Sequence, residues 1–324
     1  MISAGDFSKK QVLFVFFSRG EKLSFSNDNL VVKTAEGKIK FQCTCYRIFA
    51  VFAIGSGSIT SGLIQRAKKF GFSIILLTHS MKPYQVIGSR LEGNTLLRRA
   101  QYMYDSLDIA GHLIKNKIAN QRLAISKIRT KSEKQTEAIA LLKEYEDNIS
   151  NADTLHTILG LEGSASRIYF PAIFNNTLWQ RRAPRTKCDM INALLDIGYT
   201  ILFSYIDALL GCYGFDTYCG VLHREFYMRK SLVCDIVEPF RPLIDSELRK
   251  AINLKRCKED DFIVKQGQYL LKWEKNAEYT AWLAKPIIEN REEIYLYIQS
   301  YYRAFMRHKD IQDYPVFYFG GQKP

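Results

Sequence analysis

Short segments rich in apolar, β-branched and aromatic residues fill the start of the chain. Turn-forming residues such as Asn and Gly separate four of them: QVLFVFF (11–17), KLSFS (22–26), NLVVKT (29–34) and GKIKFQC (37–43). This pattern predicts strands joined as antiparallel hairpins. The next segments predict a helix over 58–70, capped by Ser58 and ended by Gly71, and a buried strand over 72–78.

From residue 94 onward, apolar residues recur at helical spacing. Residues 94–129 contain no Pro and many basic side chains, which predicts one long helix with a cationic face suited to a phosphate backbone. Other helices are expected to about Tyr145, over 152–174, from an Asp189 cap to about Leu210, and from Asp245 to about Arg307. The sequence thus predicts an α+β fold, with a β-rich domain over 1–90 and an all-helical domain over 91–324. The aromatic run DYPVFYFGGQKP (313–324) predicts an extended tail or a strand that docks to a partner.

Positive charge is concentrated in the first part of the chain. The 324 residues carry a net charge of +13, and residues 1–131 hold 21 Lys and Arg against 7 Asp and Glu. The remainder is therefore close to neutral. A cationic surface of this kind favours a polyanionic partner such as DNA.

The compartment follows from the cysteines and the apolar runs. Seven cysteines, an odd number, are scattered along a chain without a signal-peptide pattern, which is typical of a reduced cytoplasmic protein. No apolar run is expected to approach the roughly 18 residues that span a bilayer, so we predict no membrane partner.

Candidate chemistry is densest in YCGVLHREFYMRKSLVCDIVEPFRP (218–242). Asp235 and Glu238 are three residues apart, so a helix would place their Cβ atoms about 5–6 Å apart, close enough to hold a divalent cation. An unbroken helix would leave His223 roughly 22 Å from Glu238, so the chain must turn between them, with Ser231 as the predicted cap of a new helix. Pro239 predicts a bend just after Glu238. The alternative is a helix start with dipole-favoured acids and an ordinary packed histidine.

A third acid lies in ADTLHTILGLEGSASRIYFPAIF (152–174). Glu162 is flanked by Gly160 and Gly163, which predicts a partly buried carboxylate beside a close-approaching backbone. Buried carboxylates need a partner or a metal. The open alternatives are a metal ligand and an ion pair with Arg167 or Arg185.

A basic loop, WQRRAPRTK (179–187), follows Glu162 in sequence. Its Arg181, Arg182 and Arg185 are predicted to contact DNA phosphates, although a charge run is also typical of a solvated surface. The same DNA-binding role is predicted for Arg229, Lys230 and Arg241. Arg241 has a second reading, in which it clamps Glu238.

Four ordered motifs resemble a known family: GLEGSASRIYF (160–170), NALLDIGYTIL (192–202), GVLH (220–223) and SLVCDIVEPFRPLID (231–245). Together they resemble the CRISPR-associated adaptation integrase, the first-numbered family of CRISPR-associated proteins, over nearly the whole chain. Many members have Gly or Pro between the histidine and the following helix, whereas REFYMRK (224–230) has neither.

The resemblance implies an activity and a ligand set. It implies an integrase in which 3′-OH ends of captured DNA attack repeat boundaries of a CRISPR array, with Glu162, His223 and Glu238 as ligands of Mn²⁺ or Mg²⁺ and Asp235 as a supporting catalytic acid. It also implies a prokaryotic cytoplasmic homodimer, with dimer contacts in the β-rich domain and a small ferredoxin-like adaptation partner.

Two other functions share these residues. The first is a stand-alone metal-dependent DNA endonuclease in repair, in which water replaces the 3′-OH as nucleophile. The second is a non-catalytic nucleic-acid-binding scaffold whose acids only form ion pairs. Joining of DNA ends separates the integrase from the nuclease.

Overall fold

The computed structural model describes residues 4–175, 177, 179, 181–224 and 227–321. It divides into two compact units: the first combines Met1–Arg98 with Ser204–Phe215, and the second combines Arg99–Phe203 with Asp216–Pro324. The sequence placed a boundary near residue 90 and gave no indication that residues 204–215 join the first unit. The fold is α+β, with sheets in the N-terminal part and mostly helices afterwards.

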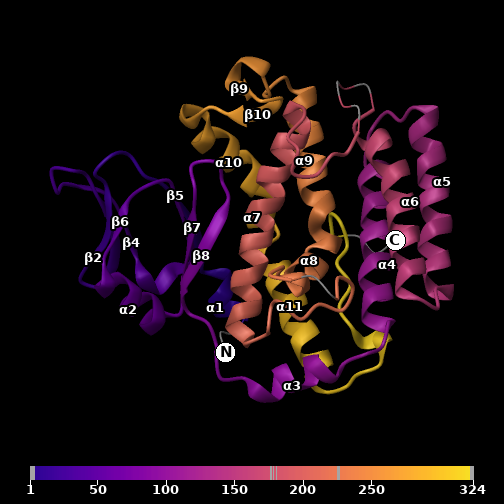
Figure 1. The fold of residues 1–324 in the computed structure, drawn as a ribbon, viewed down its shortest axis with the longest axis horizontal. Coiled ribbons are helices and arrows are strands. Elements are labelled where there is room, and N and C mark those ends of the chain that lie inside the picture. The colour runs from indigo at the N-terminus through magenta and orange to yellow at the C-terminus, as the bar shows by residue number, and fades with distance from the viewer. Residues whose placement is uncertain (1–3, 176, 178, 180, 225–226, 322–324) are drawn as a thin grey trace. The chain divides into compact units, whose positions relative to one another are not determined.

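Two four-stranded sheets and two helices form most of the first unit (Figure 1). The elements are α1 (Ala4–Ser8), β1 (Gln11–Phe16), β2 (Lys22–Ser26), β3 (Asn29–Lys33), β4 (Ile39–Thr44), β5 (Ile48–Ile54), β6 (Ser58–Ile59), α2 (Ser61–Phe70), β7 (Ser73–Leu77) and β8 (Pro83–Gly88). One sheet has the order β1-β5-β7-β8 and the other β4-β3-β2-β6. The predicted strands are thus present, and Gly71 ends α2 in the left-handed conformation, with φ of 73°.

Strand direction in the first sheet differs from the prediction. β2, β3 and β4 are antiparallel as expected, but β1 pairs with β5 and β5 with β7 in parallel. The α2 connection makes the β5–β7 crossover possible, since parallel neighbours need a long return path. All seven residues of β5 are buried, as in a central strand covered on both faces. The helix cap was also misplaced, because α2 follows Thr60 rather than Ser58.

Helices dominate the second unit, where α4, α5 and α6 lie side by side (Figure 1). The elements from here on are α3 (Thr95–Met103), α4 (Asp108–Ser126), α5 (Glu133–Asn148), α6 (Leu155–Ile173), α7 (Met190–Tyr213), α8 (Ser231–Ile236), α9 (Arg241–Asn253), β9 (Phe262–Lys265), β10 (Gln268–Leu271), α10 (Trp273–Glu289) and α11 (Arg291–Met306). Two expectations were wrong. The predicted helix over 94–129 is divided between α3 and α4, and the β9–β10 hairpin means that the C-terminal part is not all-helical.

The apolar helix α7 is the longest in the described chain. The helix is long and apolar enough to span a membrane, so the expectation that no such run exists was wrong. However, 78% of its most apolar 18-residue stretch is buried inside the protein. Asp189 Oδ1 accepts a hydrogen bond from the Asn192 amide at 2.7 Å, which caps the helix as predicted. Gly198 allows α9 to approach closely, because a Cβ there would lie 2.4 Å from Ile244 Cγ2. These features are those of a core helix.

The described part of the C-terminal tail docks on α4 of the same chain. The backbone N–H groups of Phe317 and Phe319 donate to the side-chain oxygens of Asn116 and Asn120, at 2.9 Å and 2.8 Å. Asn120 also donates to the carbonyls of Phe317 (2.9 Å) and Pro239 (3.0 Å). The buried Phe317 ring lies 4.7 Å from that of Phe240, centroid to centroid. The tail therefore supports the turn that carries Glu238.

Replacing Phe317 with Ala is expected to lower the free energy of unfolding by about 3 kcal/mol, because the cavity opens directly beneath Phe240. Urea denaturation measures this loss. Val316, which is 40% exposed on the same segment, supplies the control Val316→Ala. Equal stability of the two variants would show that the tail contributes nothing to the turn.

Candidate active site

Glu238 begins a 3₁₀ turn, η3 (Glu238–Phe240), after α8 ends at Ile236. The bend predicted from Pro239 is therefore present. The Glu238 side chain is buried, and its Oε2 lies 2.6 Å from Lys117 Nζ and 2.9 Å from Arg241 Nε. Neither contact has the alignment of a hydrogen bond, so Oε2 is a buried acceptor without an aligned donor among the described residues. Burial opposes ionisation, but Arg241 and Lys117 outweigh it and lower the pKa of Glu238 to about 2.

Lys117 joins Glu238 to Glu162. It lies on the buried stripe of α4 with Leu113 and Ile114, and its Nζ contacts Glu162 Oε1 at 2.5 Å. Burial disfavours its charge, yet attraction to Glu238 and Glu162 raises its pKa above the ordinary value. One ammonium therefore connects acids from two distant parts of the sequence.

Glu162 is half-buried on α6, as predicted. It is covered by side-chain partners and not by a neighbouring backbone. Apart from its own helix, no described atom would lie within 4 Å of a Cβ at Gly160 or Gly163, so the expected close backbone approach is wrong. The proposed ion pairs with Arg167 or Arg185 are also replaced, because Glu162 pairs with Lys117 and accepts from Ser166 Oγ at 3.0 Å. The small residues leave one side of Glu162 uncovered.

His223 is held by Asp235. The two oxygens of this fully buried carboxylate accept backbone N–H bonds from Val221 (2.7 Å), Leu222 (3.0 Å) and His223 (3.1 Å). Oδ1 also lies 2.6 Å from His223 Nδ1. A carboxylate only accepts, so Nδ1 donates to Asp235, and in the neutral ring the lone pair is then on Nε2.

Gly220 leaves room for the Asp235 carboxylate beside the His223 segment. Ser231 is not the N-cap of α8 that the sequence predicted. A Cβ at Gly220 would lie 2.7 Å from both Asp235 Oδ2 and Ser231 Cβ, so a side chain there would displace the carboxylate. α8 begins at Ser231, after Lys230 in the cap position, and Lys230 makes no side-chain cap hydrogen bond in the described part of the chain. The path from His223 to α8 includes residues 225 and 226, which lie outside the described residues.

A divalent cation fits the donor chemistry of this site. Among the described residues, no three His, Cys, Asp or Glu side chains stand close enough to form a ready-made metal centre. The carboxylates of Glu162 and Glu238 nevertheless already hold one cation, the Lys117 ammonium, and His223 is near enough to Glu238 to help lower its pKa. Oxygen and imidazole donors suit Mg²⁺ or Mn²⁺. Asp235 is not a candidate ligand in this arrangement, because both of its oxygens already accept hydrogen bonds from residues 221–223.

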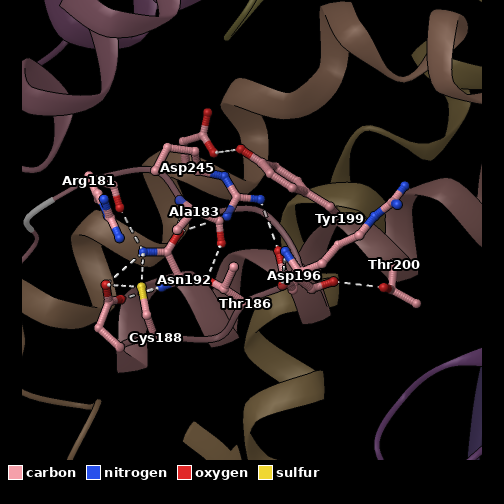
Figure 2. Close-up of polar contacts among 12 residues, drawn as sticks. Arg181, Ala183, Thr186, Cys188, Asn192, Asp196, Tyr199, Thr200 and Asp245 are labelled. Atoms are coloured by element: carbon pink, nitrogen blue, oxygen red, sulfur yellow. Dashed lines mark hydrogen bonds and ion pairs between the residues drawn. The ribbon is translucent and has the colours of Figure 1, made fainter. Parts of the chain in front are cut away.

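The loop expected to contact DNA is partly tied to α7 (Figure 2). Arg182 donates to Asn192 Oδ1 at 2.8 Å and pairs with Asp196 Oδ1 at 2.9 Å. The Ala183 amide also donates to Asn192 Oδ1, and Asn192 Nδ2 donates to the Arg181 carbonyl, both at 2.9 Å. The Arg182 guanidinium is thus used within the protein, which its place in a charge run did not reveal.

A third buried carboxylate lies behind Arg241. Asp245 accepts from the hydroxyls of Tyr199 (2.5 Å) and Tyr169 (2.9 Å), and the Tyr199 contact is visible in Figure 2. The guanidinium of Arg241 lies 4.7 Å from the Tyr199 ring centroid, and that of Arg182 lies 5.5 Å away. Arg182, Tyr199 and Arg241 therefore form a continuous support that ends at Glu238.

Asp245 predicts a pH dependence of stability. Burial is the largest effect and raises its pKa from 3.8 to about 6, against the hydrogen bonds from Tyr199 and Tyr169. The folded state therefore binds more protons than the unfolded state between pH 4 and 6, and stability falls as pH rises through that window. We expect Asp245→Asn to remove this fall, which is at most about 3 kcal/mol. Urea unfolding at pH 4 to 7 measures it, and parallel pH profiles for the two proteins would refute it.

The other predicted DNA contacts differ in exposure. Arg181 and Arg185 are exposed, and the Arg185 backbone amide donates to Asp196 Oδ2 at 3.0 Å. Arg229 and Lys230 are half-buried, and Arg229 Nε lies 3.3 Å from Cys234 Sγ. Arg241 takes the second of its two expected roles, because it contacts Glu238 directly.

The sequence reasoning missed Lys117 as a site residue. It was counted only among the basic residues of a cationic helix face, whereas it falls in phase with the apolar positions Ala110, Leu113, Ile114 and Ala124, all of which are buried. A lone Lys within an apolar helical stripe was the available signal. Tyr199 and Asp245 gave no comparable signal.

Residues 14–284 match the family model described as "CRISPR associated protein Cas1". The "CRISPR-associated endonuclease Cas1 1" of Thermodesulfovibrio yellowstonii is 29% identical over an alignment of 314 residues that covers 92% of this chain and 98% of that protein. Among solved structures, the "Cas6-RT-Cas1--Cas2 complex" matches with a TM-score of 0.78 and 23% identity, over 95% of this chain and 36% of that longer chain. A "Casposase bound to integration product" matches with a TM-score of 0.75 and 17% identity, over 98% of this chain and 96% of that one. The two structural matches show a shared fold.

Proposed function

The chain belongs to the CRISPR-associated Cas1 family, and from this membership we propose that it is an integrase of CRISPR adaptation. In the proposed reaction, the 3′-OH ends of a captured DNA segment attack phosphodiesters at the repeat boundaries of a CRISPR array. The attacking 3′-OH loses its proton as its oxygen bonds to phosphorus, the bond from that phosphorus to the 3′-oxygen of the cut strand breaks, and the leaving oxygen takes up a proton.

One observation carries the site assignment. Glu162 and Glu238, 76 positions apart in the sequence, converge on a single cation, Lys117, and His223 is held by Asp235, three residues before Glu238. We propose that Glu162, Glu238 and Nε2 of His223 hold Mn²⁺ or Mg²⁺. A divalent ion bound there supplies Lewis-acid stabilisation of charge on the phosphodiester. Asp235 orients His223, and Arg241 fixes Glu238.

The surroundings of the site suggest how DNA is held. Arg181 and Arg185 are exposed cations on a loop that Arg182 anchors, so we propose that the first two contact phosphate while Arg182 supports the loop. Arg229 and Lys230 remain proposed DNA contacts on the segment between His223 and α8. We further propose that the second unit is the catalytic domain and that the first carries homodimer contacts.

The proposed partners follow the family. The solved complex of a related chain contains Cas2, and we propose that a small partner of that kind bridges two dimers of this protein. The substrates are then spacer precursor DNA and the CRISPR repeat. The setting is the cytoplasm of a prokaryotic cell.

A strand-transfer assay tests this function. It combines Mn²⁺ or Mg²⁺, an end-labelled duplex with a free 3′-OH, and a supercoiled plasmid carrying a repeat array, with and without the small partner. Label joined to relaxed plasmid, and lost on chelation of the metal, is the expected result. Metal-dependent nicking without joined label would indicate a nuclease instead, and DNA binding without either reaction would indicate a scaffold.

A further inference from the structure

A cation supplied by the chain itself fills the centre of the site. Lys117 Nζ lies 2.5 Å from Glu162 Oε1 and 2.6 Å from Glu238 Oε2, so the two oxygens are at most about 5.1 Å apart. The lysine is 6% exposed and reaches the acids from α4, whereas they belong to α6 and η3. Three elements therefore meet at one ammonium group.

The charges of this cluster are balanced without a metal. Glu162 and Glu238 contribute two negative charges, and Lys117 and Arg241 contribute two positive charges that contact them. Charges that leave water are stable only when paired, so adding a divalent ion while all four groups stay in place would leave an excess of buried positive charge. The cluster must rearrange when a divalent ion enters.

Space leads to the same conclusion. A Mg²⁺ ion that binds carboxylate oxygens does so at about 2.0–2.1 Å, which is shorter than either contact of the ammonium. An ion that binds Glu162 Oε1 and Glu238 Oε2 from the side that Lys117 occupies would therefore overlap Lys117 Nζ. The flexible four-carbon stem of lysine allows the ammonium to move away without a change in the helix.

We propose that Lys117 is a built-in occupant of the cation site, which holds Glu162 and Glu238 together in the metal-free protein and must be displaced when a divalent ion binds. Lys117 then acts as a positioning residue that lowers the affinity for metal and keeps the empty site folded. This inference rests on the proposed function, because it takes Glu162 and Glu238 as metal ligands.

The variant Lys117→Met tests the displacement through metal binding rather than activity. Mn²⁺, followed as the free ion by electron paramagnetic resonance, is expected to bind on the order of tenfold more tightly to this variant than to the wild type, because no ammonium competes for the two carboxylates. Without metal, its Tm is expected to fall by at least about 4 °C, since the buried Glu238 and the half-buried Glu162 lose their shared cation. Mn²⁺ is then expected to raise Tm more in the variant than in the wild type.

Lys115→Met is the matched control, because Lys115 is exposed two positions earlier on the same helix and its loss removes the same charge. It is expected to change neither Mn²⁺ affinity nor metal-free Tm. A second variant, Lys117→Arg, covers the case in which Lys117→Met does not fold. It keeps the positive charge on a larger group and is expected to bind Mn²⁺ more weakly than the wild type.

The outcomes separate this inference from the proposed function. Loss of Mn²⁺ binding in Glu238→Gln supports the metal site, and unchanged or weaker binding in Lys117→Met would then overturn the displacement alone. Wild-type or tighter binding in Lys117→Arg would overturn it in the same way. Wild-type Mn²⁺ binding in Glu238→Gln would instead remove the metal site, and both proposals with it.

Discussion

Strand transfer by Glu238→Gln is expected to fall by at least about 10³-fold, because the substitution removes the charge of the most buried proposed ligand. Glutamine keeps the size of the side chain and leaves Lys117 and Arg241 with a neutral oxygen. The loss of this charge is also expected to cost about 3–5 kcal/mol of stability, as when one partner of a buried ion pair is removed.

The contribution of ionised Glu238 to folding stability is complete near neutral pH, so the variant is best compared with the wild type there. Its pKa is lowered to about 2, so its ionised form stabilises the fold above the ordinary value of 4.5, and this contribution is lost only as pH falls toward 2. At neutral pH the wild type therefore has the full contribution, and the variant has none.

The measurement is the rate of label joining at saturating Mn²⁺, with near-ultraviolet circular dichroism to confirm folding. Glu289→Gln is the control, since Glu289 is exposed and pairs only with Lys285 among the described contacts. Glu162→Gln removes the other carboxylate at a more exposed position and is expected to show the same loss of rate with a smaller loss of stability. Folded Glu238→Gln and Glu162→Gln proteins that join DNA at the wild-type rate would rule out these acids as ligands.

Asp235→Ala is expected to lower strand transfer by about 10–100-fold and stability by several kcal/mol. Supporting groups that orient a metal-binding histidine have effects of this size on activity. The stability loss arises because three backbone N–H groups and the His223 ring lose their acceptor, at about 1–3 kcal/mol for each buried donor left unpaired.

Two measurements separate orientation from simple unfolding. Urea denaturation gives the stability loss, and ¹⁵N NMR of the His223 ring reports whether Nδ1 still carries the proton. The control Asp105→Asn removes an acid that is 94% exposed and paired with Arg224. A folded Asp235→Ala protein with the wild-type ring protonation and rate would show that Asp235 only completes the local fold.

Local sequence chemistry explains which elements were predictable. Gly71 ends α2, and Asp189 caps α7, because these residue types satisfy helix ends through their own backbone freedom or side chain. The acids and the histidine were found because Glu162, His223, Asp235 and Glu238 lie in motifs of recognisable spacing. Buried apolar stripes likewise placed α6 and α7 within a few residues.

The larger errors concern features of the fold that residue pattern does not encode. The parallel pairing of β1 and β5 depends on how the chain crosses back, which alternation of residues does not encode. The helix predicted over 94–129 failed at the break between α3 and α4, although no Pro marks it. Arg182 was read as a surface cation because its partners, Asn192 and Asp196, are visible only after the loop folds on α7.

The sequence by itself determined the set of chemical groups, since residue identity and spacing specify two glutamates, an aspartate and a histidine with bends between them. Only the tertiary structure decided what each group does. Asp235 faces His223 because the Gly220 segment folds back on α8, and Glu162 meets Glu238 through Lys117 because α4 lies between them. Such charge pairings depend on distances of a few ångströms between remote segments, and local periodicity carries no information about those distances.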